Sequence, residues 1–273
     1  MVAALAVALA AAGAAGARSA TAEFALRSRA LDSPLHFVVY LPPGYVGSGL
    51  RYPVVYFLHG LPAAPGAFRT VFPEATLSEL RRHALVVAPQ GTKRPDADDE
   101  YLDLGPGRDW ETAISNELPE YVDSHFRTIA NRRGRAIIGI SAGGYGALAI
   151  GLHHLGTYSV IESWSGYGEP TNAAGTQVRD LGSAKANQRA SVHAAASSLR
   201  RAFLAHPTFL GFFVGASDTR FRDENVRLDH ELKAAGVPHA FEVYAGGHTQ
   251  SLWSRHARQW LDLALDRLLP AAP

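Results

Sequence analysis

Residues 136–150 read AIIGISAGGYGALAI, and they decide the fold of the chain. A short apolar run ends at Gly139, Ser141 stands two residues later, Gly143 follows, and a helix-forming run begins. The pattern Gly-x-Ser-x-Gly between a predicted strand and a predicted helix is typical of a nucleophile elbow. Such a turn strains the backbone of the serine and places its hydroxyl near a helix N-terminus. The alternative is a glycine-rich turn in which Ser141 is an ordinary helix cap.

Composition restricts the classes of protein to which the chain can belong. Its 273 residues are 47% hydrophobic and 19% charged, which indicates one large globular domain with a sizeable core. The formal net charge of +1 gives no reason to expect a polyanion-binding surface, so no nucleic-acid partner is predicted. The chain has no cysteine, which excludes disulfides, thiolate metal sites and a cysteine nucleophile.

The N-terminal residues 1–22 are almost entirely Ala, Val, Leu and Gly, with Arg18 as the first charge. This composition resembles a secretory signal peptide, and 15–17 and 20–22 both offer the small-x-small pattern of a cleavage site. No basic residue precedes the apolar run, so an upstream start, a weak signal, an uncleaved anchor or a cytosolic chain with an Ala-rich tail remain alternatives. We expect a secreted or cell-envelope protein whose mature chain is not inserted stably in a membrane.

Strands and helices are predicted to alternate along the rest of the chain. The predicted strands are 23–28, 35–41, 52–58, 84–88, 135–140, 158–164, 210–214 and 240–244. The predicted helices are 76–83, 110–125, the elbow helix to 153, 189–204, 225–235 and 250–269. This order predicts an α/β fold with a mostly parallel, doubly wound sheet and an N-terminal antiparallel hairpin. Residues 23–269 form a single domain in this interpretation, and 166–204 form a cap insertion.

The partners of Ser141 should lie in the loops that follow strands, because those loops meet at one edge of a parallel sheet. In α/β-hydrolases the order along the chain is serine, acid, histidine. Of the twelve histidines, His248 alone follows the last predicted strand, after two glycines that let the loop bend inward. Asp218 follows the penultimate strand and is the predicted acid. Asp223 is the alternative, although it falls at a helix start, where a carboxylate is expected in any case.

An oxyanion hole needs two backbone N–H groups near the developing negative charge. Ala142, the residue after the serine, is predicted to supply one of them. Leu61 is predicted to supply the other, because it follows Gly60 in the loop after the strand 52–58, where the chain can approach closely. His59 in the same loop is interpreted as a residue that braces the loop and not as a catalytic base.

Several segments together resemble the esterase D family, also called the putative esterase family. They are YFLHG at 56–60, GISAGGYGAL at 139–148, GGH at 246–248 with Trp253, EL at 117–118 and ELKAAGVPH at 231–239. The resemblance extends from about residue 24 to 268. It implies an α/β-hydrolase fold and ester hydrolysis without a cofactor. The family includes S-formylglutathione hydrolases, feruloyl, acetyl-xylan and siderophore esterases, and mycolyltransferases. Ala142 stands where methionine is common, but only its backbone N–H is required. The absent cysteine and the predicted export argue against the cytosolic formylglutathione branch.

The sequence therefore predicts a serine esterase that works through Ser141, His248 and Asp218 and forms an acyl-enzyme. Its substrate would be a small-molecule or polysaccharide-linked ester, and Trp253, with Trp110 and Trp164 as further candidates, could form an acyl-binding wall. One alternative is an acyltransferase of the mycolyltransferase type that passes the acyl group to a sugar or glycolipid alcohol. Another is a non-catalytic binding protein. No metal or cofactor is predicted: the acidic residues Asp96, Asp98, Asp99 and Glu100 are interpreted as a solvated loop and not as a cation site.

Overall fold

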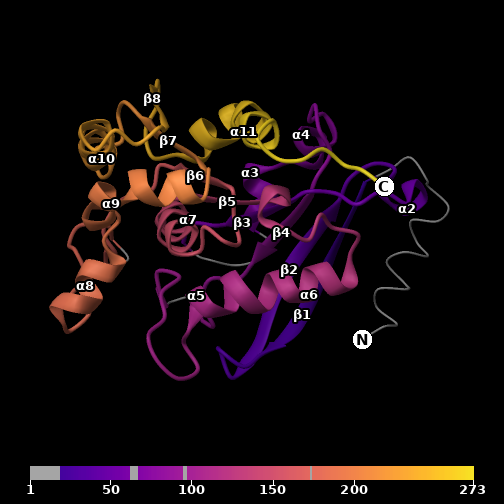
Figure 1. Cartoon of the computed structure of the whole chain (residues 1–273), viewed down its shortest axis with the longest axis horizontal. Helices are drawn as coiled ribbons and strands as arrows, with labels where there is room; N and C mark the ends of the chain where they lie inside the picture. Colours follow the sequence, from indigo (N-terminus) through magenta and orange to yellow (C-terminus); the bar gives the residue numbers. More distant parts are fainter. Residues whose placement is uncertain (1–18, 62–66, 95–96, 173) are drawn as a thin grey trace.

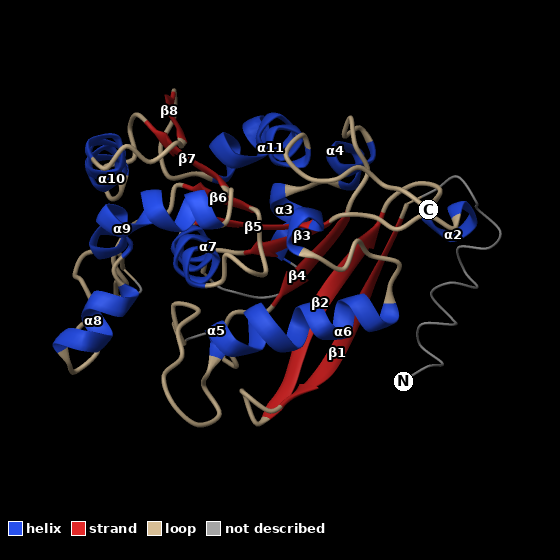
Figure 2. Ribbon diagram, viewed as in Figure 1, coloured by secondary structure: helices blue, strands red, loops and turns tan. Residues whose placement is uncertain are grey.

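The computed structural model describes residues 19–61, 67–94, 97–172 and 174–273, which form one eight-stranded sheet between two layers of helices (Figure 1; Figure 2). In spatial order the strands are β1 (Ala20–Ser28), β2 (Ser33–Leu41), β4 (Leu85–Pro89), β3 (Val54–Leu58), β5 (Arg135–Ile140), β6 (Val160–Trp164), β7 (Phe209–Gly215) and β8 (Ala240–Tyr244). The pairs β1–β2 and β2–β4 are antiparallel, and all the others are parallel. The predicted fold class is confirmed.

Side chains alternate between the two faces of the sheet and build two hydrophobic cores. On one face, Val55 and Phe57 pack with residues of three helices: α3 (Phe68–Val71), α4 (Glu74–Ser78) and α11 (Gln250–Leu265). On the other face, Tyr56 and Ile137 belong to a core that includes residues of six elements. These are α5 (Trp110–Thr112), the π-helix η2 (Ala113–Glu117), α6 (Leu118–His125), α7 (Ala142–His153), α9 (Val192–Ala205) and α10 (Arg222–Ala234). The short helices α2 (Tyr45–Ser48), η3 (Arg132–Gly134) and α8 (Ala184–Ala190) complete the described elements.

Several predicted helices differ from the structure. The predicted helix 189–204 is interrupted at Ser191, between α8 (Ala184–Ala190) and α9 (Val192–Ala205), and the predicted helix 250–269 ends at Leu265. The predicted helix 76–83 ends at Ser78, because the N–H of Arg81 donates to Asp262 of α11 at 3.0 Å instead of continuing the helix. The predicted helix 110–125 is continuous but contains the π-helix η2. Pro119 follows this π-helix and has no N–H to donate to the carbonyl four residues earlier, which favours a wider turn there.

At the N-terminus, β1 begins at Ala20, so the second candidate cleavage motif, residues 20–22, lies inside the strand and pairs with residues 39–41 of β2. Residues 1–18, which carry most of the predicted signal peptide, lie outside the described residues. Among the described residues, no helix is both long enough and apolar enough to cross a membrane.

The register of the central strands places the site. Gly139 of β5 pairs with Leu58 of β3 on one side and with Ser163 of β6 on the other. The loops after β3, β5 and β6 therefore leave the sheet side by side at its carboxyl edge. This is the edge at which doubly wound sheets bind ligands.

Candidate active site

Ser141 connects β5 to α7 in a strained conformation. Its φ is 52° and its ψ is −122°, values that a residue with a side chain rarely adopts. Its side chain makes no capping hydrogen bond to α7. Its backbone N–H donates to the carbonyl of Trp164 at the end of β6, at 3.0 Å. The alternative of an ordinary helix cap is therefore wrong, and the hydroxyl is available for another partner.

The glycines beside Ser141 are required by close backbone contacts. A Cβ on Gly139 would lie 2.0 Å from the carbonyl oxygen of Gly143, and a Cβ on Gly143 would lie 2.1 Å from the carbonyl oxygen of Leu58. Both distances are far below van der Waals contact, and the opposing atoms are backbone atoms that cannot rotate away. The elbow therefore requires glycine at both positions.

Substituting Gly143→Ala is expected to lower the free energy of unfolding by at least about 3 kcal/mol, because β3 and α7 must separate to admit the methyl group. Gly156→Ala is the matched control, since a Cβ there meets no atom within 4 Å. Urea unfolding of both variants measures the difference. Equal stability of Gly143→Ala and the wild type would show that the elbow is looser than the structure indicates.

His248 and Asp218 lie beside Ser141, as the order of the strands predicts. His248 stands in the loop between β8 and α11, and its Nε2 lies 2.9 Å from the Oγ of Ser141. Asp218 stands in the loop between β7 and α10, and its Oδ2 lies 2.8 Å from the Nδ1 of His248. The alternative acid, Asp223, has a side chain that is 86% exposed and pairs with Arg222. Asp218 and not Asp223 is therefore the carboxylate beside His248.

The surroundings of Asp218 favour its ionised form. The residue is only 1% exposed, and burial alone would raise the pKa of its carboxyl. Three hydrogen bonds to the carboxylate outweigh this effect of burial. One comes from His248, and the N–H groups of Arg220 and Phe221 both donate to Oδ1 at 3.2 Å. The pKa of Asp218 therefore lies below its ordinary value. An ionised carboxylate holds the proton of His248 on Nδ1, so Nε2 is free to accept the proton of Ser141.

The two predicted N–H donors of the oxyanion hole belong to elements next to Ser141. Ala142 is the first residue of α7, so its N–H lies at the helix terminus, where N–H groups have no partner within the helix. Leu61 is 39% exposed and lies at the end of the described part of its loop, since residues 62–66 are outside it. Gly60 lets this loop approach closely, because a Cβ on it would lie 3.0 Å from the Cβ of Ser141. The role of both donors stays a prediction.

A hydrogen bond to a main-chain carbonyl holds the loop after β3 in place. The carbonyl of His59 accepts a hydrogen bond from the hydroxyl of Tyr101 at 2.7 Å. The His59 ring is 1% exposed and has no hydrogen-bond partner among the described residues. Burial lowers the pKa of this ring to about 4. The ring is therefore neutral near pH 7, and it is the backbone of His59 whose hydrogen bond braces the loop.

Aromatic side chains surround His248. The rings of Trp253 and Phe221 lie edge-on to its imidazole, at centroid distances of 5.0 and 5.2 Å. Tyr167 stacks on Phe221 at 4.5 Å, and the indole N–H of Trp253 donates to Ser165. Phe221 and Tyr167 were not predicted as site residues. Tyr167 follows β6 at the carboxyl edge of the sheet, a position that could have indicated it.

The other two candidate tryptophans do not form an acyl-binding wall. Trp110 and Trp164 are fully buried. The indole N–H of Trp110 donates to Asp99 at 2.9 Å, and that of Trp164 donates to Glu162 at 3.0 Å. Both are core residues.

Asp99 and Glu100 of the acidic loop after β4 are buried and not solvated, which corrects the sequence interpretation of these two residues. Asp99 is 8% exposed and binds Arg108 and Trp110, and Glu100 is 2% exposed. Asp96 lies outside the described residues. The polar composition of this loop does not reveal the partners that the fold supplies. Within the described ranges no group of three or more His, Asp or Glu side chains is arranged to hold a metal ion.

Glu100 ties this loop to the segment predicted as a cap. Its carboxylate accepts hydrogen bonds from the hydroxyl of Tyr167, at 2.8 and 2.9 Å, and from the N–H of Thr171, at 3.0 Å. The predicted cap, 166–204, therefore begins against the site, and its helix α9 packs against α7 and α10 in the core on that face of the sheet. Glu100 has a φ of 52°, a strained backbone that these contacts hold in place.

Burial and the nearby charge of Asp98 raise the pKa of Glu100 from 4.5 to about 8, and the hydrogen bonds from Tyr167 and Thr171 offset this only in part. The folded protein therefore holds a proton that the unfolded chain releases between pH 4.5 and 8. The stability of the wild type relative to Glu100→Gln is expected to fall as the pH rises through this window, by roughly 5 kcal/mol in total, and to stay constant above it. Urea unfolding of both proteins between pH 5 and 9 measures this difference. Parallel curves would contradict the raised pKa.

Comparison with known proteins places the chain in a family. A model of the Esterase family, described as "Putative esterase", matches residues 28–258. Esterase Rv1288 of Mycobacterium tuberculosis is 28% identical over 236 residues, which cover 77% of this chain and 51% of that protein. The chain thus spans about half the length of the curated relatives that it matches.

Solved structures share the fold. A ferulic acid esterase superposes with a TM-score of 0.78 at 24% identity and covers 92% of this chain and 100% of its own. An S-formylglutathione hydrolase from Agrobacterium tumefaciens superposes with a TM-score of 0.77 at 19% identity and covers 92% of this chain and 96% of its own. The family match covers most of the chain, and it includes Ser141, Asp218 and His248. The chain therefore belongs to the Esterase family.

Proposed function

We propose that this protein is a serine carboxylic-ester hydrolase in which Ser141 is the nucleophile, His248 the general base and acid, and Asp218 the residue that orients His248. One observation carries the proposal: the hydrogen-bonded series from the Ser141 Oγ through both ring nitrogens of His248 to a buried Asp218 carboxylate, with distances of 2.9 and 2.8 Å. Membership of the Esterase family supports the same reaction class.

The reaction proceeds in two halves. In the first, the Ser141 Oγ attacks the ester carbonyl carbon while its proton passes to Nε2 of His248. The N–H groups of Ala142 and Leu61 stabilise the oxyanion, an effect worth roughly 3 kcal/mol per donor. The bond to the alcohol then breaks, and His248 gives its proton to the leaving oxygen. In the second half, water attacks the acyl-enzyme by the same route, which releases the acid and restores Ser141.

We propose small acyl and aromatic-acyl esters as the substrates. The rings of Phe221 and Trp253 support this choice, because both are apolar and both contact His248, whose Nε2 lies beside Ser141. A ferulic acid esterase shares the fold, which supports an aromatic acyl group in the proposed substrate.

Hydrolysis of p-nitrophenyl esters from acetate to palmitate tests the proposal, and the chain-length optimum measures the acyl site. Mass spectrometry after reaction with a fluorophosphonate should find the adduct on Ser141 alone. Product analysis with added sugar alcohols separates the alternatives: free acid identifies a hydrolase, whereas acylated sugar identifies an acyltransferase. A folded protein that neither reacts with the probe nor cleaves any ester would overturn the proposal in favour of a binding protein.

We also propose that the chain is exported. The apolar, alanine-rich run that precedes Arg18 supports this proposal. N-terminal sequencing of the protein recovered from the medium or the cell envelope tests it. Recovery of the intact chain from the cytosol would contradict it.

A further inference from the structure

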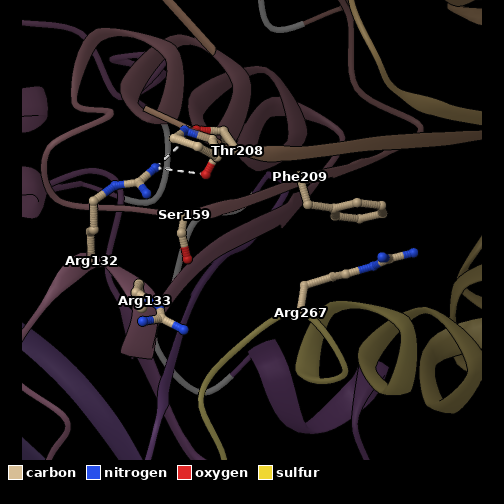
Figure 3. Close-up of a pocket in the computed structure, with 7 residues that line it drawn as sticks. Arg132, Arg133, Ser159, Thr208, Phe209 and Arg267 are labelled. Atoms are coloured by element: carbon tan, nitrogen blue, oxygen red, sulfur yellow. Dashed lines mark hydrogen bonds between the residues drawn. The ribbon is translucent and has the colours of Figure 1, made fainter. Parts of the chain in front are cut away.

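A cavity of about 520 Å³ lies at the edge of the sheet opposite Ser141, where β5, β6 and β7 begin (Figure 3). Three arginines line it, Arg132, Arg133 and Arg267. Strand β5 begins at Arg135 and ends just before Ser141, so six residues, or about 20 Å of strand, separate the two regions. The cavity is therefore distinct from the candidate active site.

The positive charge of this cavity is not compensated. Within the described part of the chain, none of the three arginines forms an ion pair with a carboxylate. Arg132 donates only to neutral oxygens: the carbonyls of Leu155 at 2.7 Å, Pro207 at 3.1 Å and Tyr158 at 3.3 Å, and the hydroxyl of Thr208 at 3.0 Å. Burial lowers the pKa of its guanidinium, as expected of a cation without a counter-charge.

Two of these guanidinium groups are already fixed. The four contacts of Arg132 hold it at one side of the cavity, beside Thr208 (Figure 3). Arg267 lies over the ring of Phe209, with its guanidinium carbon 5.1 Å from the ring centroid. Asp266, its neighbour in the chain, binds Arg81 and Arg82 instead. Binding of an anion here would therefore require little ordering of arginine side chains other than that of Arg133.

Ser159 provides a second sign of a ligand. It lines the cavity and is 8% exposed, and both its backbone groups are used, by Arg135 of β5 and Phe209 of β7. Its hydroxyl points toward the space between Arg133 and Arg267 and has no partner among the described residues (Figure 3). A buried hydroxyl without a hydrogen bond destabilises a protein, so a ligand oxygen here would satisfy it.

We propose that this cavity binds a phosphomonoester of the size of a sugar phosphate. Three guanidinium groups suit a doubly charged anion, and their planar N–H pairs match the geometry of phosphate oxygens. The volume admits more than the phosphoryl group alone. Phosphomonoesters occur both on soluble sugars and on lipid headgroups, and the guanidinium groups would bind the phosphoryl group that the two share.

Calorimetric titration with glucose 6-phosphate and with inorganic phosphate, at constant ionic strength, tests the proposal. Saturable binding of both is expected, with no binding of glucose. The double variant Arg133→Gln/Arg267→Gln should bind at least about tenfold more weakly, because it loses two charge-assisted contacts. Arg201→Gln is the matched control, since Arg201 is an exposed arginine on α9 that does not line the cavity. It should bind as the wild type does.

Three results would overturn the proposal: no saturable binding by the wild type, equal binding by the double variant with an unchanged melting temperature, or an equal loss in Arg201→Gln. Cosedimentation with phosphatidic acid vesicles that the double variant loses, by a protein that binds no glucose 6-phosphate, would assign the site to a lipid headgroup instead. The titration works equally well in Ser141→Ala. Its outcome is therefore independent of the proposed esterase activity.

Discussion

Ser141→Ala is expected to lower kcat/KM for p-nitrophenyl acetate by about 10⁵-fold or more, with little change in stability. The hydroxyl supplies the atom that forms the acyl-enzyme, and no other nucleophilic side chain of the described residues forms a hydrogen bond with His248 Nε2. The hydroxyl makes no capping bond to α7, so the substitution removes its hydrogen bond with His248 but no contact that holds the elbow. The residual rate would come from substrate binding and the oxyanion hole alone.

Ester hydrolysis and fluorophosphonate labelling measure this loss, and thermal unfolding shows whether the variant is folded. Ser251→Ala is the matched control, because Ser251 is an exposed serine three residues after His248 whose hydroxyl, among the described residues, forms a hydrogen bond with Thr249 alone. It should keep wild-type activity and labelling. If Ser141→Ala retained a large part of the activity, the nucleophile would have to lie elsewhere.

The sequence was sufficient for the parts of the site that depend on topology. Once Gly139 and Gly143 marked a strand-to-helix turn, the loops after later strands had to meet at the same edge, and this reasoning identified His248 and Asp218. Short strands buried on both faces were also predicted closely, because continuous apolar runs such as residues 136–140 allow few other structures. The structure brings all three side chains within hydrogen-bond distance.

Contacts between segments far apart in the chain could not be predicted. Glu100 is buried only because Tyr167 and Thr171, about 70 residues later, donate to it. The helix α4 ends early because Asp262, more than 180 residues away, accepts the N–H of Arg81. The arginine-lined cavity combines residues 132–133, 159, 207–209 and 267, which no local pattern joins. Each of these features depends on where the finished fold places a partner, and periodicity carries no such information.

Asp218→Asn is expected to lower kcat by about 10⁴-fold while leaving KM within a few-fold of the wild type. The structure gives a specific reason. The Oδ1 of Asp218 accepts the N–H groups of Arg220 and Phe221 at 3.2 Å, so an asparagine must keep its oxygen there. Its NH₂ then faces Nδ1 of His248, 2.8 Å from the present Oδ2 position. Nδ1 becomes an acceptor, the ring proton moves to Nε2, and Nε2 can no longer take the proton of Ser141.

Asp223→Asn is the matched control, because Asp223 is the alternative acid, lies in the first turn of α10, is largely exposed and pairs with Arg222. It should keep nearly full activity. Because the backbone N–H bonds survive in Asp218→Asn, its melting temperature should stay close to that of the wild type, so a loss of kcat would reflect the histidine tautomer and not unfolding. A loss as large in Asp223→Asn as in Asp218→Asn would contradict the assignment. Full activity in Asp218→Asn would show that His248 is oriented by something other than this carboxylate.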